Sequence, residues 1–161
     1  MIRSGVVRIA LVVLVVTAGC WQEAAQPAAT TTPTVHKLDA RKPPASHHTV
    51  WEGKYTCAQG VTGAHLELDT ASNGVTTGIF EFFSVAQNPN WVPRGSYRLR
   101  GLVTMSPAGS FALALAPAGW ITEPPGYLMV GLQATSDRER RSLIGRLTDP
   151  SCASMKLARI H

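Results

Sequence analysis

This sequence lacks long runs of basic residues and long runs of apolar residues. No run of Lys and Arg is longer than two residues, and charged residues make up only 16% of the 161, although the net charge is +5. A nucleic-acid-binding domain usually gathers its basic residues in a cluster or stripe, so we expect no nucleic-acid partner. The sequence also has no Gly-x-Ser-x-Gly motif, which would indicate a hydrolase nucleophile. The length fits one domain.

Apolar runs are short as well. The run Ile9–Val16 is well below the length of about 20 residues that a membrane-spanning helix needs. Arg3 and Arg8 precede it, and a basic start followed by a short apolar run is typical of a secretory signal. We therefore expect the protein to be exported. An uncleaved membrane helix is the alternative that the short run disfavours.

The apolar run ends in Ala18-Gly19-Cys20, which resembles the bacterial lipobox. The resemblance implies that residues 1–19 are a signal peptide and that the Cys20 thiol receives a diacylglyceryl group after cleavage. We expect a lipoprotein that is anchored to the cell membrane by this lipid and faces outside the cytoplasm. The alternative is an ordinary secretory signal that leaves Cys20 unmodified.

Residues 20–50 are predicted to form a disordered tether. They are rich in Ala, Thr and Pro, show no apolar periodicity, and cannot bury enough surface to offset their ordering entropy. A flexible chain of this length averages roughly 30 Å from end to end, so the following domain can stand away from the membrane. The adjacent His47 and His48 fall in this tether, where we expect metal capture to be incidental. We predict no metal site and no cofactor.

Residues 51–161 alternate apolar and polar side chains with the period of two that is typical of β-strands. Asn73-Gly74 is a tight-hairpin signal. Proline cannot donate to a strand ladder, and we expect all seven prolines of this region to lie between strands. The pattern predicts eight strands, at about 51–57, 64–69, 75–85, 97–104, 111–115, 127–134, 143–148 and 152–160.

Cys57 and Cys152 are the cysteines that remain once Cys20 is lipidated, and an oxidising compartment favours their pairing. They lie in the first and last predicted strands, which are neighbours in an eight-stranded meander only if the sheet closes. The fold expected is therefore an all-β, eight-stranded antiparallel up-and-down barrel. A β-sandwich with stapled edge strands is the alternative. The residues expected to fill the barrel are Phe80, Phe82, Leu99, Phe111 and Leu113.

In such a barrel the connections after odd-numbered strands share one rim. The two long ones, residues 86–95 and 117–126, each contain Trp and Pro, and stiffened aromatic loops suit partner binding. The tether joins the opposite rim, so these loops should face away from the membrane. The alternative is that the tryptophans plug the barrel end and that Arg94 pairs with Glu123. The predicted partner-binding residues are Trp91, Arg94, Tyr97, Trp120, Glu123 and Tyr127.

Two pairs of like charges lie two residues apart and therefore point to one side of a strand. Glu67 and Asp69 could serve glycoside hydrolysis if they flanked a sugar. A solvated strand face is the favoured interpretation, and the same holds for Arg98 and Arg100.

Residues 51–60, followed by Leu66 and Leu68, resemble the opening of the membrane-bound C-type lysozyme inhibitors. That resemblance implies a small, lipid-anchored, disulfide-bearing eight-stranded barrel. The inhibitory Ser-Gly-x-Arg-Tyr loop of that family is absent, because residues 94–97 hold similar residue types in another order. The likeness therefore concerns architecture only.

The expected function is non-catalytic: a lipid-anchored barrel that binds or blocks another envelope component, either a protein or a glycan. One alternative is an envelope enzyme that acts on lipid or peptidoglycan from a site in the barrel mouth. Another is a lipocalin-like carrier of a small molecule, which would need an unfilled interior.

Overall fold

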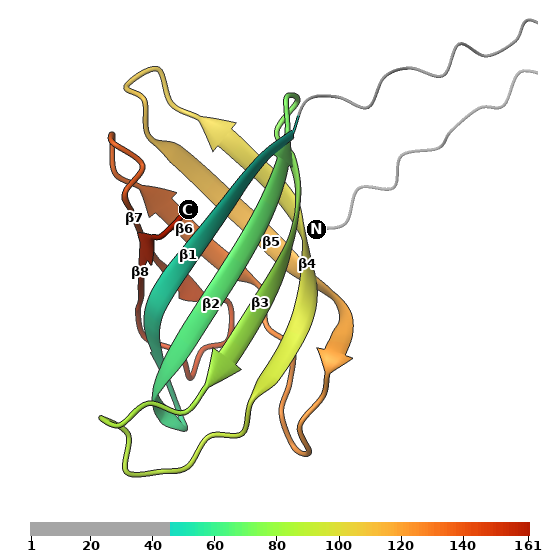
Figure 1. Ribbon diagram of the computed structural model, residues 1–161, viewed down its shortest axis with the longest axis vertical. Helices are drawn as coiled ribbons and strands as arrows, with labels where there is room; N and C mark the ends of the chain where they lie inside the picture. Colours follow the sequence, from blue (N-terminus) through green and yellow to red (C-terminus); the bar gives the residue numbers. More distant parts are fainter. Residues whose placement is uncertain (1–45) are drawn as a thin grey trace, which may run out of the picture. The chain divides into compact units, whose positions relative to one another are not determined.

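The computed structural model describes residues 46–161, and they form one closed antiparallel barrel in which each strand pairs with its neighbours in sequence (Figure 1). The ladder between the first and last strands closes it, so the predicted barrel is confirmed and the sandwich alternative is wrong. The signal peptide, Cys20 and most of the tether lie outside the described residues. The strands are β1 (Ser46–Cys57), β2 (Gly60–Ala71), β3 (Val75–Phe83), β4 (Gly95–Met105), β5 (Phe111–Thr122), β6 (Leu132–Ser136), β7 (Ser142–Leu147) and β8 (Met155–Arg159).

Strand β1 begins five residues earlier than the sequence pattern predicts. Ser46 pairs with Ala71, and the ladder to β2 continues without interruption to Cys57. Residues 46–50 were expected to be tether because they are polar and show little alternation. They are strand because β2 is long, and its second half would otherwise present an unpaired edge.

The second difference concerns β5, which runs on to Thr122 through a segment that was predicted to be loop. Pro117 therefore lies inside a strand, and the prediction for that proline is wrong. A register shift next to Leu99 accommodates it, and the ladder from β5 to β6 has already ended at Leu115. No hydrogen bond to β6 is lost at Pro117, because that side of β5 has no strand partner there. Residues 127–131, expected to start β6, are loop.

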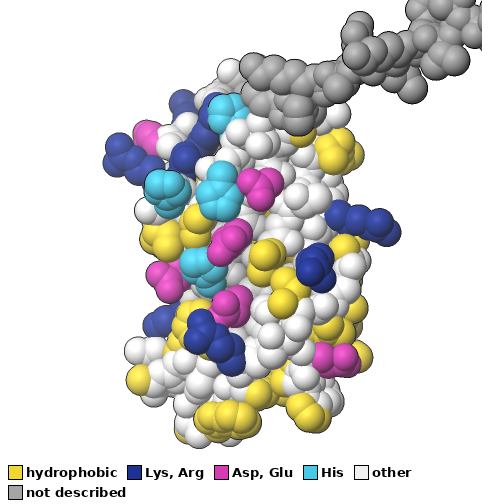
Figure 2. Space-filling model, turned by 45° about the vertical axis from the view of Figure 1, so that its right-hand side comes forward, with side chains coloured by type: hydrophobic (Ala, Val, Ile, Leu, Met, Phe, Trp, Pro, Cys, Tyr) yellow, Lys and Arg dark blue, Asp and Glu magenta, His cyan; other side chains and the backbone are white. Residues whose placement is uncertain are grey.

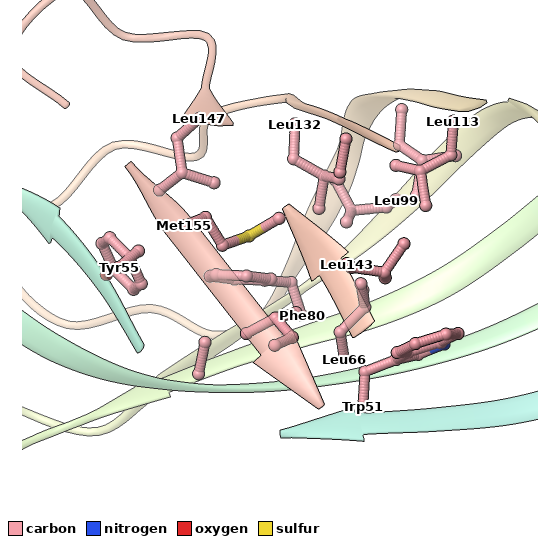
Figure 3. Close-up of a cluster of buried hydrophobic side chains, with 14 of the residues drawn as sticks. Trp51, Tyr55, Leu66, Phe80, Leu99, Leu113, Leu132, Leu143, Leu147 and Met155 are labelled. Carbon is pink, nitrogen blue, oxygen red and sulfur yellow. The ribbon is translucent and has the colours of Figure 1, made fainter. Parts of the chain in front are cut away.

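Apolar side chains fill the barrel interior. Each of the eight strands contributes to the cluster drawn in Figure 3, where side chains from opposite walls meet. Trp51 is fully buried, and its indole nitrogen donates to the hydroxyl of Thr49 at 3.0 Å. The five residues that the sequence predicted inside are all buried: Phe80, Phe82, Leu99, Phe111 and Leu113.

The two rims differ as predicted. At the upper rim in Figure 1 the connections are short, and the turn between β2 and β3 holds Gly74 at a φ of 84°, a left-handed conformation that glycine adopts without strain. The lower rim carries the longer loops 84–94, 123–131 and 148–154. The described residues contain no helix that is long and apolar enough to cross a membrane.

Candidate functional site

A disulfide joins the end of β1 to the loop before β8 at the rim that carries the long loops. Cys57 ends β1 and is bonded to Cys152, which lies in the loop before β8 rather than within that strand. Backbone hydrogen bonds from Ala153 to Thr56 and from Thr56 to Ser154 extend the pairing between the two segments. The predicted pairing is confirmed, and a structural disulfide suggests a location outside the cytoplasm.

Trp91 projects from the loop 84–94 with 78% of its surface exposed. The loop is held on both sides of it. The amide of Asn88 donates to the carbonyl of Gln59 at 2.8 Å and its oxygen accepts from the Asn90 backbone at 2.9 Å. On the other side Val92 is buried in the core cluster. The indole is therefore presented to solvent by an anchored backbone.

Arg94 reaches from the end of this loop onto the outer wall of the barrel. Its guanidinium pairs with the carboxylate of Glu81 and lies 5.9 Å from the ring centre of Phe83. The Phe83 ring in turn covers Gly63, where it leaves no room for a β-carbon. The alternative ion pair with Glu123 is wrong, because Arg94 pairs with Glu81 and Glu123 is exposed elsewhere in the loop after β5.

These residues border an open depression of about 710 Å³ on the outer face of β1, β2 and β3, which we call the outer groove. Its floor is set by strand register: Glu52, His65 and Glu81 lie directly opposite one another on the three strands. Two residues along β2, Glu67 approaches the His65 ring at 3.4 Å. Histidine and acidic side chains gather in one band on the face shown in Figure 2. Trp91 and Arg94 line the groove from the loop side.

The band continues toward the short-turn rim. His48 of β1 lies 3.1 Å from a carboxylate oxygen of Asp69, its register partner on β2. Glu67 and Asp69 thus share one face as predicted, and each contacts a histidine on the water-exposed wall. The pairing of His48 with Asp69 was missed because His48 was assigned to the tether. Among residues 46–161, no group of three or more His, Cys, Asp and Glu is arranged to hold a metal ion.

The aromatic residues predicted for partner binding do not form one surface. Tyr97 is only 1% exposed, and its hydroxyl donates to the Val130 carbonyl at 2.8 Å, so it belongs to the core and cannot contact a partner. Trp120 lies in β5, half-buried, with its ring edge-on to Tyr97 at 5.4 Å. Tyr127 stacks on Phe82, also at 5.4 Å. Trp120 therefore packs into the barrel end, as the plug alternative predicts, and Tyr127 packs there as well, whereas Trp91 does not.

Burial also governs the ionisation of the inner tyrosines. It raises the pKa of Tyr55 to about 12, against a smaller opposing effect of hydrogen bonds from Thr62 and Gln59. Burial raises the pKa of Tyr97 as well, and more strongly. Both hydroxyls are therefore neutral at physiological pH.

Sequence reasoning found Trp91 and Arg94 through the composition of their loop. It did not find the floor of the groove, because Glu52, His65 and Glu81 come together only through the register of three strands. A signal was present, since each is a polar residue between two inward-facing positions of its strand. No protein-family model matches this chain, and no curated protein matches it either.

Proposed function

We propose that this protein is a non-catalytic binding protein of the cell envelope, lipid-anchored at Cys20, whose outer groove contacts a protein or glycan of that envelope. The observation that carries the proposal is the exposure of Trp91 on an anchored loop, beside a groove that offers charged and polar groups. Exposed tryptophan is costly in water and is enriched among residues that dominate binding energy. A stiff aromatic side chain also loses little entropy on contact.

The position of the groove favours binding over catalysis. Acid–base and nucleophilic catalysis gain most from sites that exclude water. The outer groove lies open on the barrel wall, and two of its charged groups, Arg94 and Glu81, already neutralise each other. A surface of this kind suits contact with a partner.

The entry point of the chain supports outward presentation. Strand β1 begins at the short-turn rim, where Ser46 pairs with Ala71 at the end of β2. The preceding chain must join the barrel there, so a lipid at Cys20 would tether the barrel by that rim. The loop that carries Trp91 lies at the opposite rim (Figure 1).

The anchor is tested by Cys20→Ala. We expect this variant to leave the detergent phase in phase partitioning and to appear in a soluble fraction, while circular dichroism of the barrel stays unchanged. Membrane association that persists in the variant would contradict the lipid anchor.

The groove is tested by Trp91→Ala, with Leu128→Ala as the matched control because the two side chains are equally exposed, at 78%. We expect Trp91→Ala to weaken binding by about 2 kcal/mol, roughly thirtyfold, to whichever of two materials binds the unaltered protein: purified cell-wall glycan or solubilised envelope protein. Leu128→Ala should bind normally. Equal binding by both variants would overturn the assignment of the groove.

A further inference from the structure

A second concave feature lies at the barrel mouth, separate from the outer groove. It is a pocket of about 420 Å³ at the rim with the long loops, which we call the mouth pocket. Inward-facing aromatic residues border it toward the barrel interior. The disulfide between Cys57 and Cys152 borders one side, and the loop that contains Leu128 and Val130 borders another. Barrel mouths are a frequent location for small-molecule sites, and this volume lies within the range of such sites, about 300 to 1,000 Å³.

The polar groups around the mouth pocket already have partners. The Tyr97 hydroxyl donates to the Val130 carbonyl, and the side-chain amide of Gln59 donates to the Tyr55 hydroxyl at 3.3 Å. Asp149 accepts hydrogen bonds from the backbone and hydroxyl of Ser151. Among the described residues, no buried side-chain nitrogen or oxygen lacks a hydrogen-bond partner. A ligand in the pocket would therefore meet more apolar than polar surface, and no buried side-chain group there depends on it for a hydrogen bond.

Charge narrows the ligand class. The residues that line the mouth pocket include no Lys, Arg or His, and they include one carboxylate, that of Asp149. Hydrogen bonds from Ser151 lower the pKa of Asp149, which keeps it ionised. The pocket thus repels anions and offers them no cation, so a fatty acid or another anionic amphiphile is a poor occupant.

The filled interior sets the depth of the site. Phe80 and Leu147 border the pocket and are themselves buried in the core, so a ligand cannot pass between them into the barrel. At the rim, Leu128 exposes 78% of its surface next to the opening, and a ligand seated there would cover part of it. The site suits a compact molecule at the mouth rather than a long chain threaded through the barrel.

We infer that the mouth pocket binds a small apolar molecule of up to about three rings that carries no negative charge. This site is separate from the outer groove, and its ligand binding is a second activity beside the proposed partner binding. It differs from a lipocalin-like calyx because the interior beneath it is packed.

Two fluorescent probes with the same ring system test the inference on the full exported chain carrying Cys20→Ala, which avoids detergent and lipid. N-phenyl-1-naphthylamine is neutral, and 8-anilinonaphthalene-1-sulfonate adds one negative charge. We expect saturable binding of the neutral probe at one site per chain, and at least about tenfold weaker binding of the sulfonate. Unsaturable binding, or equal affinity for the two probes, would overturn the inference.

Variants locate the binding. Val130→Trp should fill the pocket and weaken binding of the neutral probe at least about tenfold. If that variant lowers stability, Ala58→Trp, at an exposed lining position, should weaken probe binding in the same way. Ile144→Trp is the control, because Ile144 is an exposed apolar residue on the outer wall of β7. Probe affinity that Val130→Trp or Ala58→Trp leaves unchanged in the folded protein would place the probe elsewhere. Trp91→Ala should not alter it, which separates this site from the outer groove.

Discussion

Trp91 and Trp120 show how far two residues of one type can differ in environment. Trp120 packs edge-on against Tyr97 and Phe82, whereas Trp91 stands in solvent. We expect Trp120→Ala to lower the free energy of unfolding by about 3 kcal/mol, because truncating a packed aromatic side chain leaves a cavity. Trp91→Ala should change it by less than about 0.5 kcal/mol. Urea denaturation of both variants measures the difference, and equal losses would contradict the assignment of their environments.

Tyr55 makes stability depend on alkaline pH. Its pKa rises from the ordinary value of 10.0 to about 12 in the folded barrel, because burial disfavours the phenolate. Between these values the unfolded chain has lost the proton and the folded protein keeps it. Stability is therefore complete below pH 10 and falls as the pH rises toward 12, by at most about 1.4 kcal/mol per pH unit for this group.

The measurement is the free energy of unfolding in urea across this alkaline range, compared between the unaltered protein and Tyr55→Phe. The variant should lose stability less steeply, because one of the two buried phenols has been removed. Parallel slopes for the two proteins would show that Tyr55 ionises normally in the folded state.

At the scale of elements, the loop 84–94 depends on Asn88. Its side chain bridges the Gln59 carbonyl of the turn between β1 and β2 and the Asn90 backbone of its own loop. Asn88→Ala should cost about 1 kcal/mol, because the substitution leaves the partly buried Gln59 carbonyl without its donor. Amide hydrogen exchange should also become faster within the loop.

The exposed neighbour Asn90 provides the control. Asn90→Ala keeps the backbone donor and should leave both stability and exchange unchanged. If the groove binds a partner, Asn88→Ala should also weaken that binding without touching Trp91. Slow exchange that persists in Asn88→Ala would show that the other anchors of the loop, buried Val92 and the pair of Arg94 with Glu81, are sufficient to hold it.

The alternation of apolar and polar residues predicted the bounds of some strands and not of others. Alternation located β3, β4 and β7 closely because one face of each is covered by the core. It failed for Pro117 and for residues 46–50, where a partner strand decides the structure. Proline fits in β5 because the ladder to β6 stops at Leu115, and the polar start of β1 is strand because β2 needs a neighbour.

At the scale of the whole molecule, the disulfide ties the first and last segments of a loop of 95 residues. Replacing both cysteines, as in Cys57→Ser with Cys152→Ser, should lower stability by up to about 4.6 kcal/mol on the chain-entropy model. The ladder between β1 and β8 still closes the barrel, so the variant should keep the circular dichroism spectrum of the folded protein. Unfolding in urea measures the loss. A variant that is unfolded even without denaturant would mean that the strand ladder cannot close the barrel alone.

The sequence by itself determined the fold class, and it favoured a closed barrel over a stapled sandwich. Alternating side chains specify strands locally, and a cysteine in the first strand and another near the last require those ends to meet. It also determined that a loop lies between the third and fourth strands, because proline and asparagine exclude that segment from the sheet.

Only the tertiary structure decided which aromatic residues face solvent. Trp91 and Trp120 stand in similar sequence surroundings, but one follows a loop held outward by Asn88 and the other follows β5 inward onto Tyr97. The floor of the outer groove and the composition of the mouth pocket have the same origin. Each brings together residues distant in the chain, through strand register in one case and through barrel closure in the other. Local patterns carry neither kind of information, because both arise from pairing between strands.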